Sequence, residues 1–418
     1  MITILCSGSR GDFQPYIALA QEIKRRGHDV RISANDDFKD FIEGYGIECF
    51  PLKASISNLN VDAKLLEQAG SSDNPLKMLF TFNKMKKYGE YMVEDMYKAC
   101  QGSDLIIYHP GCTIGYFAAR EMGIPAVMAS PFPMHKTNEY LSVVMYGKSK
   151  SNNRNIALSY KMIQSMLWMA SKTSVKGFLK KKNGTLPKDF GCPFENVSSK
   201  YPAIASCSNY VFPRPKDWKK NIYQNGYWFV QEKTEYKPSE KLESFLKSGE
   251  KPVYIGFGSM TSLGNYDALL QMVIEALHKT GKRGVVSGLH RGEKIPDNIC
   301  AIDAVPHTWL FPKMAAVCHH GGAGTTAAGF AARVPSIIVP FSNDQFAWAH
   351  RAYDLKVGAP PIYKKNLSAN ALADGIAFAM QNEIIENAKM LGNKILTEQG
   401  TTAAVDIILG CLEGTHEE

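Results

Sequence analysis

The chain has 418 residues, of which 45% are hydrophobic and 21% are charged, and its formal net charge is +8. This is an ordinary globular composition, and the length predicts two or three domains. The mild positive charge suits phosphate-bearing ligands or an anionic membrane surface. It is too weak to argue for nucleic acid, and we identify no basic helix, zinc module or RNP-like motif, so we expect no nucleic-acid partner.

Nine cysteines are spread from Cys6 to Cys411 without a CxxC pair. This pattern predicts reduced, mostly buried thiols in a cytoplasmic protein. The N-terminus enters a polar glycine-rich loop directly after Leu5 and lacks the features of a signal peptide. Because we find no run of about 18 apolar residues, we expect no membrane-spanning helix. We therefore predict a cytoplasmic protein with possible peripheral membrane contact, as a monomer or weak dimer.

Short apolar strands alternate with longer amphipathic helices in the first half of the chain. The pattern predicts a strand at Ile2–Cys6, a glycine-containing loop, a helix at Gln14–Arg26 and a strand at Asp29–Ser33, which together form a βαβ unit. Further strands are predicted at Leu105–Tyr108 and Ala126–Ala129, with a helix at Thr113–Met122 between them. The fold class is therefore α/β, with a doubly wound parallel sheet in this half.

Prolines and lysines mark a change of texture at 213–240, where we place a domain linker. A second alternation then predicts another Rossmann-like domain, with strands at Val253–Phe257, Gly284–Ser287, Ala301–Ala304, Ala315–Cys318 and Ser336–Val339 and helices at Tyr266–Lys279 and from Thr325. We predict an acceptor-binding domain at 1–212, a donor-binding domain at 241–383, and a helical segment at 384–418 that packs back toward the first domain. Ligands are expected at the carboxyl ends of the strands, in a cleft between two such domains.

The strongest motif is Cys318-His319-His320-Gly321-Gly322-Ala323-Gly324-Thr325-Thr326. A strand ends there and a glycine-rich turn leads into a helix, whose first N–H groups and positive dipole end favour an anion. Gly322 and Gly324 let a diphosphate approach the backbone, while His320 and Thr325 can donate further hydrogen bonds. The alternative is an ordinary strand-to-helix turn, which the double histidine makes less attractive.

Two other strand ends carry polar groups. Asp344 and Gln345 can bind vicinal sugar hydroxyls, or Asp344 can simply cap the next helix. In the N-terminal loop, Asp12 can act as a general base, and Ser9 with Arg10 can reach a phosphate. The alternative for that loop is a capping Asp12 beside a solvated arginine.

These segments together resemble one family. The runs that carry the resemblance occur in this order: Gly8-Ser9-Arg10-Gly11-Asp12, Gly226-Tyr227-Trp228-Phe229, Pro306-His307-Thr308-Trp309-Leu310-Phe311, the HHGGAGTT run, and Pro340–Gln345. The sequence resembles the sterol glucosyltransferases and the related bacterial glucosyltransferases that act on macrolides and glycopeptide antibiotics. The resemblance spans roughly residues 1–360.

The resemblance implies a GT-B fold and an inverting transfer from UDP-glucose to a hydroxyl of a lipophilic acceptor, without a metal or resident cofactor. It implies that Asp12 is the catalytic base. The implied donor contacts are Ser9, Arg10, Ser259, Val305, His307, His320, Gly322, Gly324, Thr325, Asp344 and Gln345. Plant-type relatives use an N-terminal histidine as base and a tryptophan against uracil; this loop has no histidine, and Ala304 replaces that tryptophan. His109, after a strand of the same sheet, is the fallback base.

The acceptor is left open by the sequence. Methionines and aromatics concentrate at Met78–Tyr97 and Ile156–Leu179, which suits an adaptable apolar pocket or simply a packed core. The basic run Lys180–Lys182 can touch anionic lipid, although a solvated surface is the simpler interpretation. Two other functions remain open: a lipid-linked N-acetylglucosaminyltransferase on the same fold, and a non-catalytic nucleotide-sugar-binding protein.

Overall fold

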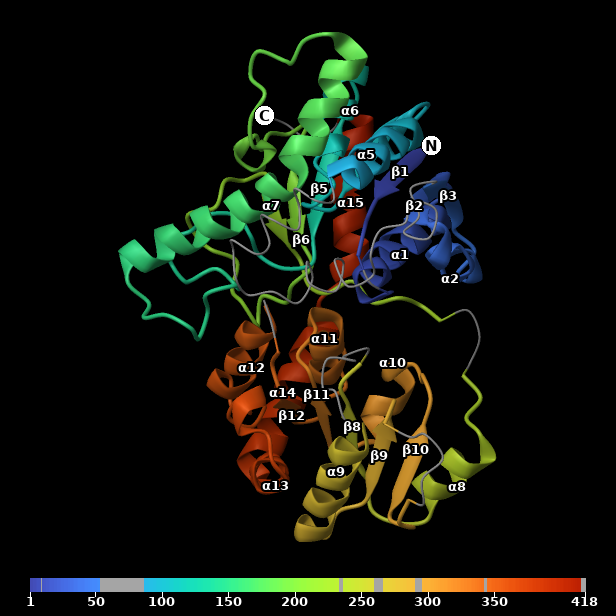
Figure 1. Cartoon of the computed structure of the whole chain (residues 1–418), viewed down its shortest axis with the longest axis vertical. Helices are drawn as coiled ribbons and strands as arrows, with labels where there is room; N and C mark the ends of the chain where they lie inside the picture. Colours follow the sequence, from blue (N-terminus) through green and yellow to red (C-terminus); the bar gives the residue numbers. More distant parts are fainter. Residues whose placement is uncertain are drawn as a thin grey trace. The chain divides into compact units, whose positions relative to one another are not determined.

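The computed structural model describes residues 1–8, 10–52, 86–232, 236–258, 266–289, 295–341 and 344–414. The chain divides into two compact units, each with its own parallel sheet (Figure 1). Unit 1 comprises Met1–Ser142, Lys150–Lys233 and Gln399–Glu418, and unit 2 comprises Val143–Ser149 and Thr234–Glu398.

Unit 1 is built on a seven-stranded parallel sheet in the order β3-β2-β1-β4-β5-β6-β7. In the inner strand β1, Ile4 lies opposite Ile32 of β2 and Ile107 of β4, and all three side chains are buried. The strands are β1 (Ile2–Leu5), β2 (Val30–Asn35), β3 (Glu48–Leu52), β4 (Leu105–Tyr108), β5 (Ala126–Ser130), β6 (Ala203–Ala205) and β7 (Ile222–Gln224). Both faces of such a sheet must be covered, which explains its almost continuously apolar strands.

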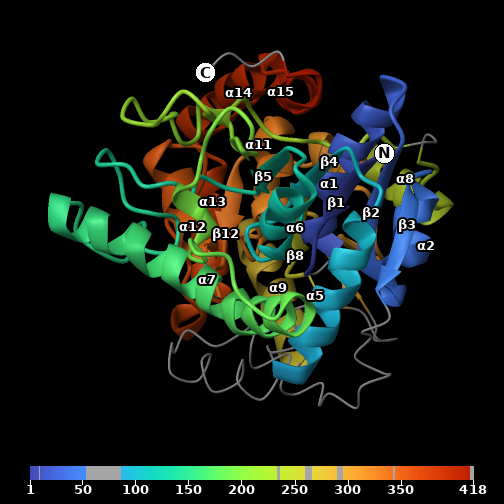
Figure 2. The same ribbon diagram turned by 90° about the horizontal axis from the view of Figure 1, so that it is seen from above.

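The helices of unit 1 cover the two faces of its sheet with separate apolar cores. One core includes residues of α1, α2 and α15, and the other includes residues of α5, α6 and α7. Figure 2 shows α5 and α7 crossing one another on their side of the sheet. The helices are α1 (Arg10–Arg25), α2 (Lys39–Gly44), α5 (Lys86–Cys100), α6 (Ile114–Met122), α7 (Asn153–Asn183) and α15 (Gly400–Glu413), with short 3-10 turns η1 (Asp36–Phe38) and η2 (Pro193–Glu195).

Unit 2 repeats the design with a five-stranded parallel sheet in the order β10-β9-β8-β11-β12. Its strands are β8 (Val253–Gly256), β9 (Gly284–Ser287), β10 (Ile299–Ile302), β11 (Ala316–His319) and β12 (Ser336–Ile338). Its helices are α8 (Glu240–Lys247), α9 (Tyr266–Thr280), α10 (His307–Leu310), α11 (Ala323–Ala331), α12 (Gln345–Asp354), α13 (Ala369–Ala379) and α14 (Asn382–Thr397), with turns η4 (Phe311–Lys313) and η5 (Lys364–Asn366). The prediction of two doubly wound, Rossmann-like domains is confirmed.

The domain boundaries differ from those expected. Ile222–Gln224 forms the edge strand β7, so most of the expected linker at 213–240 belongs to unit 1, and the change of unit falls between Lys233 and Thr234. The short segment Val143–Ser149 belongs to unit 2. At the other end, α14 stays in unit 2 and only the chain from Gln399 onward joins unit 1. Lysines and prolines around β7 hid this short strand in the sequence.

The C-terminal segment Asn382–Glu413 is long and apolar enough, by length and composition, to cross a membrane. This differs from the expectation that no such segment exists. However, the segment is divided at Glu398 and Gln399 into α14 and α15, which have 16 and 14 residues. Each is shorter than the roughly 20 residues of a spanning helix, and each packs in a different unit. The buried apolar residues of α15 belong to a core of unit 1, whereas α14 has both buried residues and the exposed Met390 and Leu396.

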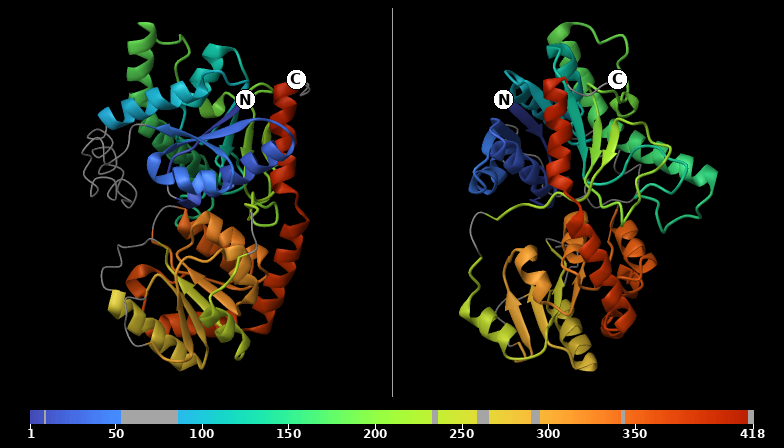
Figure 3. Two further views of the ribbon diagram at one scale, coloured as in Figure 1. Left: turned by 90° about the vertical axis from the view of Figure 1, so that its right-hand side faces the viewer. Right: turned by 180° about the vertical axis from the view of Figure 1, so that it is seen from behind.

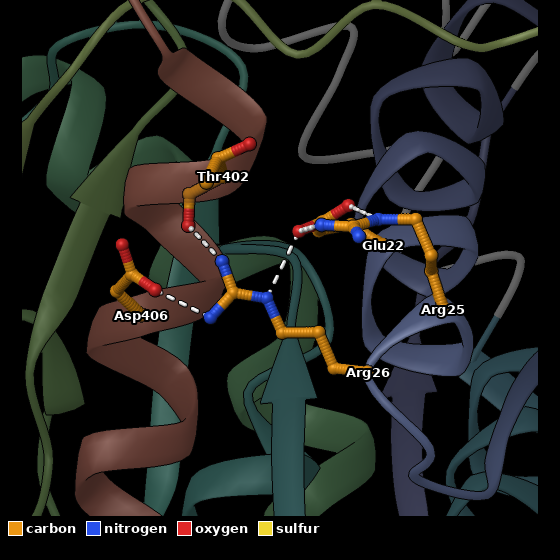
Figure 4. A network of polar contacts seen from close by, with 5 residues as sticks. All are labelled: Glu22, Arg25, Arg26, Thr402 and Asp406. Atoms are coloured by element: carbon orange, nitrogen blue, oxygen red, sulfur yellow. Dashed lines mark hydrogen bonds and ion pairs between the residues drawn. The ribbon is translucent and has the colours of Figure 1, made fainter.

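Helix α15 packs beside α1 in unit 1 (Figure 3), and a network of charged groups joins the two helices (Figure 4). Arg26, just after α1, donates to Asp406 and to the carbonyl oxygen of Thr402 on α15. Its Nε also donates to Oε1 of Glu22 at 2.9 Å, and Arg25 donates to both oxygens of that carboxylate at 2.7 Å. The Glu22 carboxyl is buried, and these hydrogen bonds, led by those of Arg25, hold its pKa below the ordinary value.

We expect Glu22→Ala to lower the free energy of unfolding by about 1–2 kcal/mol, because two arginines lose a buried charged acceptor. Asp406→Ala should cost less than about 1 kcal/mol, since the Asp406 side chain is half exposed and its pair is screened by water. Urea denaturation of both variants beside the parent chain measures the difference. Equal losses from the two variants would contradict this account of the network.

Candidate active site

The turn after β11 can be made only by glycine at position 321. Gly321 has a φ of +91°, a conformation that residues with a Cβ rarely adopt. A Cβ there would lie 2.7 Å from Cγ2 of Ile338 and 3.1 Å from the carbonyl oxygen of Gln345. The missing side chain therefore lets the turn pack directly against the start of α12.

His319 holds this turn from inside the protein. Its Nδ1 accepts a hydrogen bond from the N–H of Gly321 at 3.0 Å, so Nε2 carries the proton of the neutral ring. The side chain is fully buried, and burial first, then the neighbouring His320 and His307, lowers its pKa well below the ordinary value. His319 is thus a neutral structural group at neutral pH.

The turn leads directly into the N-terminus of α11, where the first backbone N–H groups make no hydrogen bond with the described residues. The first internal bond of the helix runs from the N–H of Thr326 to the carbonyl oxygen of Gly322, the N-cap residue, at 2.9 Å. The N–H groups of Ala323, Gly324 and Thr325 have no hydrogen-bond partner among the described residues. Such a row of donors, at the positive end of a helix, favours an anion.

The two threonines of this helix start have different roles. The hydroxyl of Thr326 is buried and donates to the carbonyl oxygen of Gly322 at 2.9 Å. The half-buried Thr325 has no hydroxyl partner in the described part of the chain. Position 324 is open: a Cβ there would meet nothing within 4 Å. The free space and the available donors thus lie at the same helix end.

The ring of His320 lies between two glycines. A Cβ at Gly322 would be 2.8 Å from its Nε2, and a Cβ at Gly258, which follows β8 with a φ of +64°, would be 3.1 Å from its Cε1. Its Nδ1 is buried and has no hydrogen-bond partner among the described residues. The absence of side chains at both glycines therefore leaves room for the ring. Buried polar atoms normally have a hydrogen-bond partner, so we expect a ligand to supply one for Nδ1 of His320.

His307, at the start of α10, completes a group of three histidines. Its ring stacks on Phe311, with centroids 4.3 Å apart, and meets Tyr254 edge-on at 5.8 Å. Burial, and then the nearby His320, lowers the pKa of His307 to about 4, and burial also lowers the pKa of His320. All three rings are therefore neutral at neutral pH and act as hydrogen-bonding groups rather than cations.

Asp344 and Gln345 are fixed beside the same turn. The indole N–H of the buried Trp348 donates to Oδ2 of Asp344 at 2.7 Å, and the N–H of Phe341 donates to Oε1 of Gln345 at 2.8 Å. Asp344 is the N-cap residue of α12 but makes no side-chain capping bond. These hydrogen bonds orient both side chains. Because Asp344 makes no side-chain capping bond, the alternative that its side chain caps α12 is wrong.

In unit 1, Asp12 lies in the first turn of α1, which begins at Arg10 rather than at the expected Gln14. Gly8 precedes it with a φ of +136°, and a Cβ there would lie 2.4 Å from Oδ2 of Asp12. The loop between β1 and α1 therefore needs a glycine so that the carboxylate can lie against its backbone. The carboxylate of Asp12 is half-buried near the carboxyl end of β1.

His109 lies beside Asp12, directly after the neighbouring strand β4. It is half-buried, and its Nδ1 accepts from the N–H of Gly111 at 3.0 Å, so Nε2 carries the proton. Burial lowers the pKa of His109, and the negative charge of Asp12 partly opposes this. The structure thus brings together both of the candidate bases identified in the sequence.

The structure describes only some of the other residues that the sequence predicted as donor contacts. Arg10 is exposed, and its guanidinium lies 4.4 Å from the ring centroid of Phe41 within unit 1. Val305 is half-buried and packs against an apolar core of unit 2. Ser9 and Ser259 lie outside the described residues, so their roles stay predictions. No cluster that could hold a metal ion occurs among the described histidines, cysteines and acids.

The methionine-rich segments do not form a single apolar lining. Met96 of α5 is buried in the core of unit 1, whereas Met162 and Met169 of α7 are 42% and 49% exposed. The part of the first segment before Lys86 lies outside the described residues. Acceptor entry between these helices stays a prediction.

Comparisons with known proteins follow the two units. The family 28 glycosyltransferase N-terminal domain matches residues 2–140, and the C-terminal domain of erythromycin biosynthesis protein CIII-like proteins matches residues 267–408. A solved structure described as the glycotransferase of kitacinnamycin superposes with a TM-score of 0.70 at 18% identity, covering 98% of each chain. The fold is therefore that of the GT-B glycosyltransferases.

Two curated relatives narrow this class. The sterol 3-beta-glucosyltransferase UGT80B1 of Arabidopsis thaliana is 32% identical over 97% of this chain and 67% of its own length. The sterol 3-beta-glucosyltransferase of Yarrowia lipolytica is 33% identical over 98% of this chain but only 28% of its own length. The chain belongs to the sterol glucosyltransferase family, and it spans about two thirds of the plant relative and under a third of the fungal one.

The neutral histidines predict a specific loss of stability in acid. A histidine whose pKa is depressed by folding binds a proton more readily when unfolded, so stability is complete above the ordinary pKa of about 6.5 and falls as the pH drops toward the folded value. For His307 this window runs from the ordinary value of 6.5 down to about 4.

We expect His307→Phe, which keeps the stacking on Phe311, to reduce the slope of unfolding free energy against pH by up to about 1.4 kcal/mol per pH unit between about pH 4.5 and 6. Urea denaturation across this range measures the slope. At pH 7.5 the ring is neutral in both states, so any difference there reports packing alone. An unchanged slope in the variant would show that His307 is not held neutral by the fold.

Proposed function

We propose that the chain transfers glucose from UDP-glucose to a hydroxyl group of a sterol-like, lipophilic acceptor, with inversion at the anomeric carbon and without a metal. Family membership supports the transfer of a sugar, and the names of the relatives support a sterol acceptor and glucose. The observation that carries the proposal is the unpartnered set of donors at the start of α11, facing open space at Gly324.

The donor diphosphate is assigned to this helix end. The N–H groups of Ala323, Gly324 and Thr325, the hydroxyl of Thr325 and the ring of His320 supply hydrogen bonds to its oxygens. As the bond from the anomeric carbon to the diphosphate breaks, negative charge grows on the leaving group. Hydrogen-bond donors that are already oriented stabilise this negative charge without reorganising. Such electrostatic stabilisation is usually the largest contribution to catalysis.

The rest of the donor is assigned to neighbouring segments of unit 2. Val305 and His307 are the proposed contacts of the uridine, next to His320. Asp344 and Gln345 are the proposed contacts of the glucose hydroxyls. Their orientation is set by Trp348 and by the backbone of Phe341, and Gln345 packs against the same glycine turn. The amide and carboxylate suit vicinal hydroxyls because they offer both donors and acceptors.

Asp12 is the proposed general base. An inverting displacement needs a group that accepts the acceptor's hydroxyl proton as the oxygen attacks the anomeric carbon. The competing His109 is poorly suited, because its Nε2 carries the proton and its Nδ1 already accepts from Gly111. Protonation of Nδ1 would break that bond inside a buried site that already disfavours the cation. We assign His109 to positioning and Asp12 to proton transfer.

Replacing Asp12 by Asn is expected to lower kcat by at least about 10²–10⁴-fold, because general-base catalysis is lost while the shape is kept. UDP-glucose should bind nearly as before, because the contacts proposed for its diphosphate, uridine and glucose in unit 2 are unchanged. The measurement is UDP release with UDP-glucose and a sterol, with calorimetry for donor affinity. A dead His109→Ala variant beside a normally active Asp12→Asn variant would reverse the assignment.

His320→Ala is expected to weaken UDP binding by roughly tenfold or more, the loss of one charge-assisted hydrogen bond. The two threonines give a matched pair for the same calorimetric measurement. Thr325→Val should weaken UDP severalfold, whereas Thr326→Val should leave affinity nearly unchanged, because that hydroxyl is used inside the helix. If the Thr326 variant weakens UDP as strongly as the Thr325 variant, the diphosphate is not at this helix end.

A further inference from the structure

Helix α7 is basic along its whole length. Its 31 residues, Asn153–Asn183, contain seven basic residues and no aspartate, glutamate or histidine. The seven are Arg154, Lys161, Lys172, Lys176, Lys180, Lys181 and Lys182. The formal charge of the whole chain is +8, so this helix carries nearly all of the excess and the remainder is close to neutral (+8 less +7). The expectation that the chain has no basic helix is therefore wrong.

Most exposed residues of α7 lie along one face of the helix. Its members Arg154, Leu158, Lys161, Ser165, Met169, Lys172, Lys176 and Lys180 are three or four residues apart, the spacing that keeps side chains on the same face, and Met162 and Thr173 lie directly beside this row. The other exposed residues, Asn153, Lys181, Lys182 and Asn183, lie at the two ends of the helix. At 1.5 Å per residue, this face is roughly 40 Å long from Arg154 to Lys180.

The two halves of this exposed face differ in chemistry. The N-terminal half carries three large apolar side chains, Leu158, Met162 and Met169, which are 59%, 42% and 49% exposed, beside two cations, Arg154 and Lys161. The C-terminal half carries Lys172, Lys176 and Lys180. The opposite face is buried and includes Ile163, Val175 and Phe178, so α7 is anchored in unit 1 by that side. Figures 1 and 2 show the N-terminal half of α7 extending away from α5 and α6.

Three lysines of the exposed face are not held in ion pairs with the described residues. The ion pairs of α7 join Lys181 to Glu94 and Lys182 to Glu121, both off this face. Lys172, Lys176 and Lys180 form no ion pair with the described residues. A row of unneutralised cations that continues a row of exposed apolar side chains fits a partner that is both anionic and apolar.

We propose that this face of α7 lies on the surface of a membrane that contains anionic lipid. Leu158, Met162 and Met169 insert between the lipid headgroups, and Lys172, Lys176 and Lys180 lie over lipid phosphates. An interfacial helix of this kind combines buried apolar area with electrostatic attraction. The proposal complements the proposed function, since a sterol-like acceptor resides in membranes, but its test does not depend on catalysis.

The binding is reversible and weakens with salt. Each basic side chain near an anionic surface strengthens membrane partition by about fivefold, and this contribution falls off within a Debye length of roughly 8–10 Å. Three partly exposed apolar side chains add a contribution that salt does not screen. The chain is therefore expected to partition onto anionic membranes and to leave neutral ones.

The test is co-sedimentation of the full chain with vesicles of phosphatidylcholine alone or with about a third phosphatidylserine, an anionic surface. Changing Lys172, Lys176 and Lys180 together to Glu should lower partition onto the anionic vesicles at least about 100-fold. Changing Leu158, Met162 and Met169 together to Ser should lower it at least about tenfold, also at high salt. The matched control changes the exposed Lys216, Lys219 and Lys220 of unit 1 to Glu, with the same loss of charge, and should bind nearly as the parent does.

Circular dichroism and calorimetric UDP binding establish that each variant is folded. Parental binding by both α7 variants would overturn the proposal, as would equal loss in the control, which would mean that only net charge matters. Failure of the parent chain to bind anionic vesicles would also overturn it and would point to an acidic protein partner. None of these outcomes bears on Asp12 or on the donor site, so failure here and failure of the proposed function are distinguishable.

Discussion

The hydrogen bond from the Gly321 N–H to His319 Nδ1 is the constraint on which the donor half of the molecule depends. It exists only while the His319 ring is neutral, and burial keeps it so. The bond fixes the turn, the turn sets the direction of α11, and the bare Cα of Gly321 lets Gln345 approach. This one turn thus positions the start of α11, His320 and the segment at Asp344.

A histidine that accepts a hydrogen bond from the N–H of a glycine two residues later occurs in both units. In unit 1, His109 accepts from the N–H of Gly111, two residues later, just as His319 accepts from Gly321. Both histidines stand at the carboxyl end of the strand next to the first strand of their sheet, β4 beside β1 and β11 beside β8. The two sheets therefore have an imidazole that accepts from a following glycine in equivalent places, fully buried in unit 2 and half-buried in unit 1. In one it adjoins a carboxylate, and in the other a helix end that lacks partners.

The sequence predicted most of this architecture because buried parallel strands are almost continuously apolar, even where they have only four residues. Leu105–Tyr108 and Gly284–Ser287 have the predicted bounds. The edge strand β7 was missed, since three residues between lysines give no periodicity. Likewise, the glycine-rich motif indicated the donor site, but nothing in it distinguished the inward Thr326 from Thr325. That difference depends on which hydroxyl turns back to Gly322.

Charge distribution was the other feature that residue patterns concealed. The basic residues of α7 are too widely spaced along the chain to form a cluster in sequence, apart from Lys180–Lys182. Only the helical geometry aligns Lys172, Lys176 and Lys180 with the apolar side chains before them. A net charge of +8 looked modest for the whole chain, although the seven basic residues of one helix, α7, nearly equal it.

The path of the chain through unit 1 has a consequence for its biosynthesis. Ala404, Val405 and Ile408 of α15 are fully buried in the same core as Ile17 and Ile23 of α1. Arg26 and Asp406, which join the two helices, are 380 residues apart. At about 5–20 residues per second, a ribosome needs roughly 20–80 s to cover that distance. During this interval the core that α1, α2 and α15 share lacks the side chains of α15, so the part of this core that α15 covers in the folded chain stays open until residues 400–413 are made.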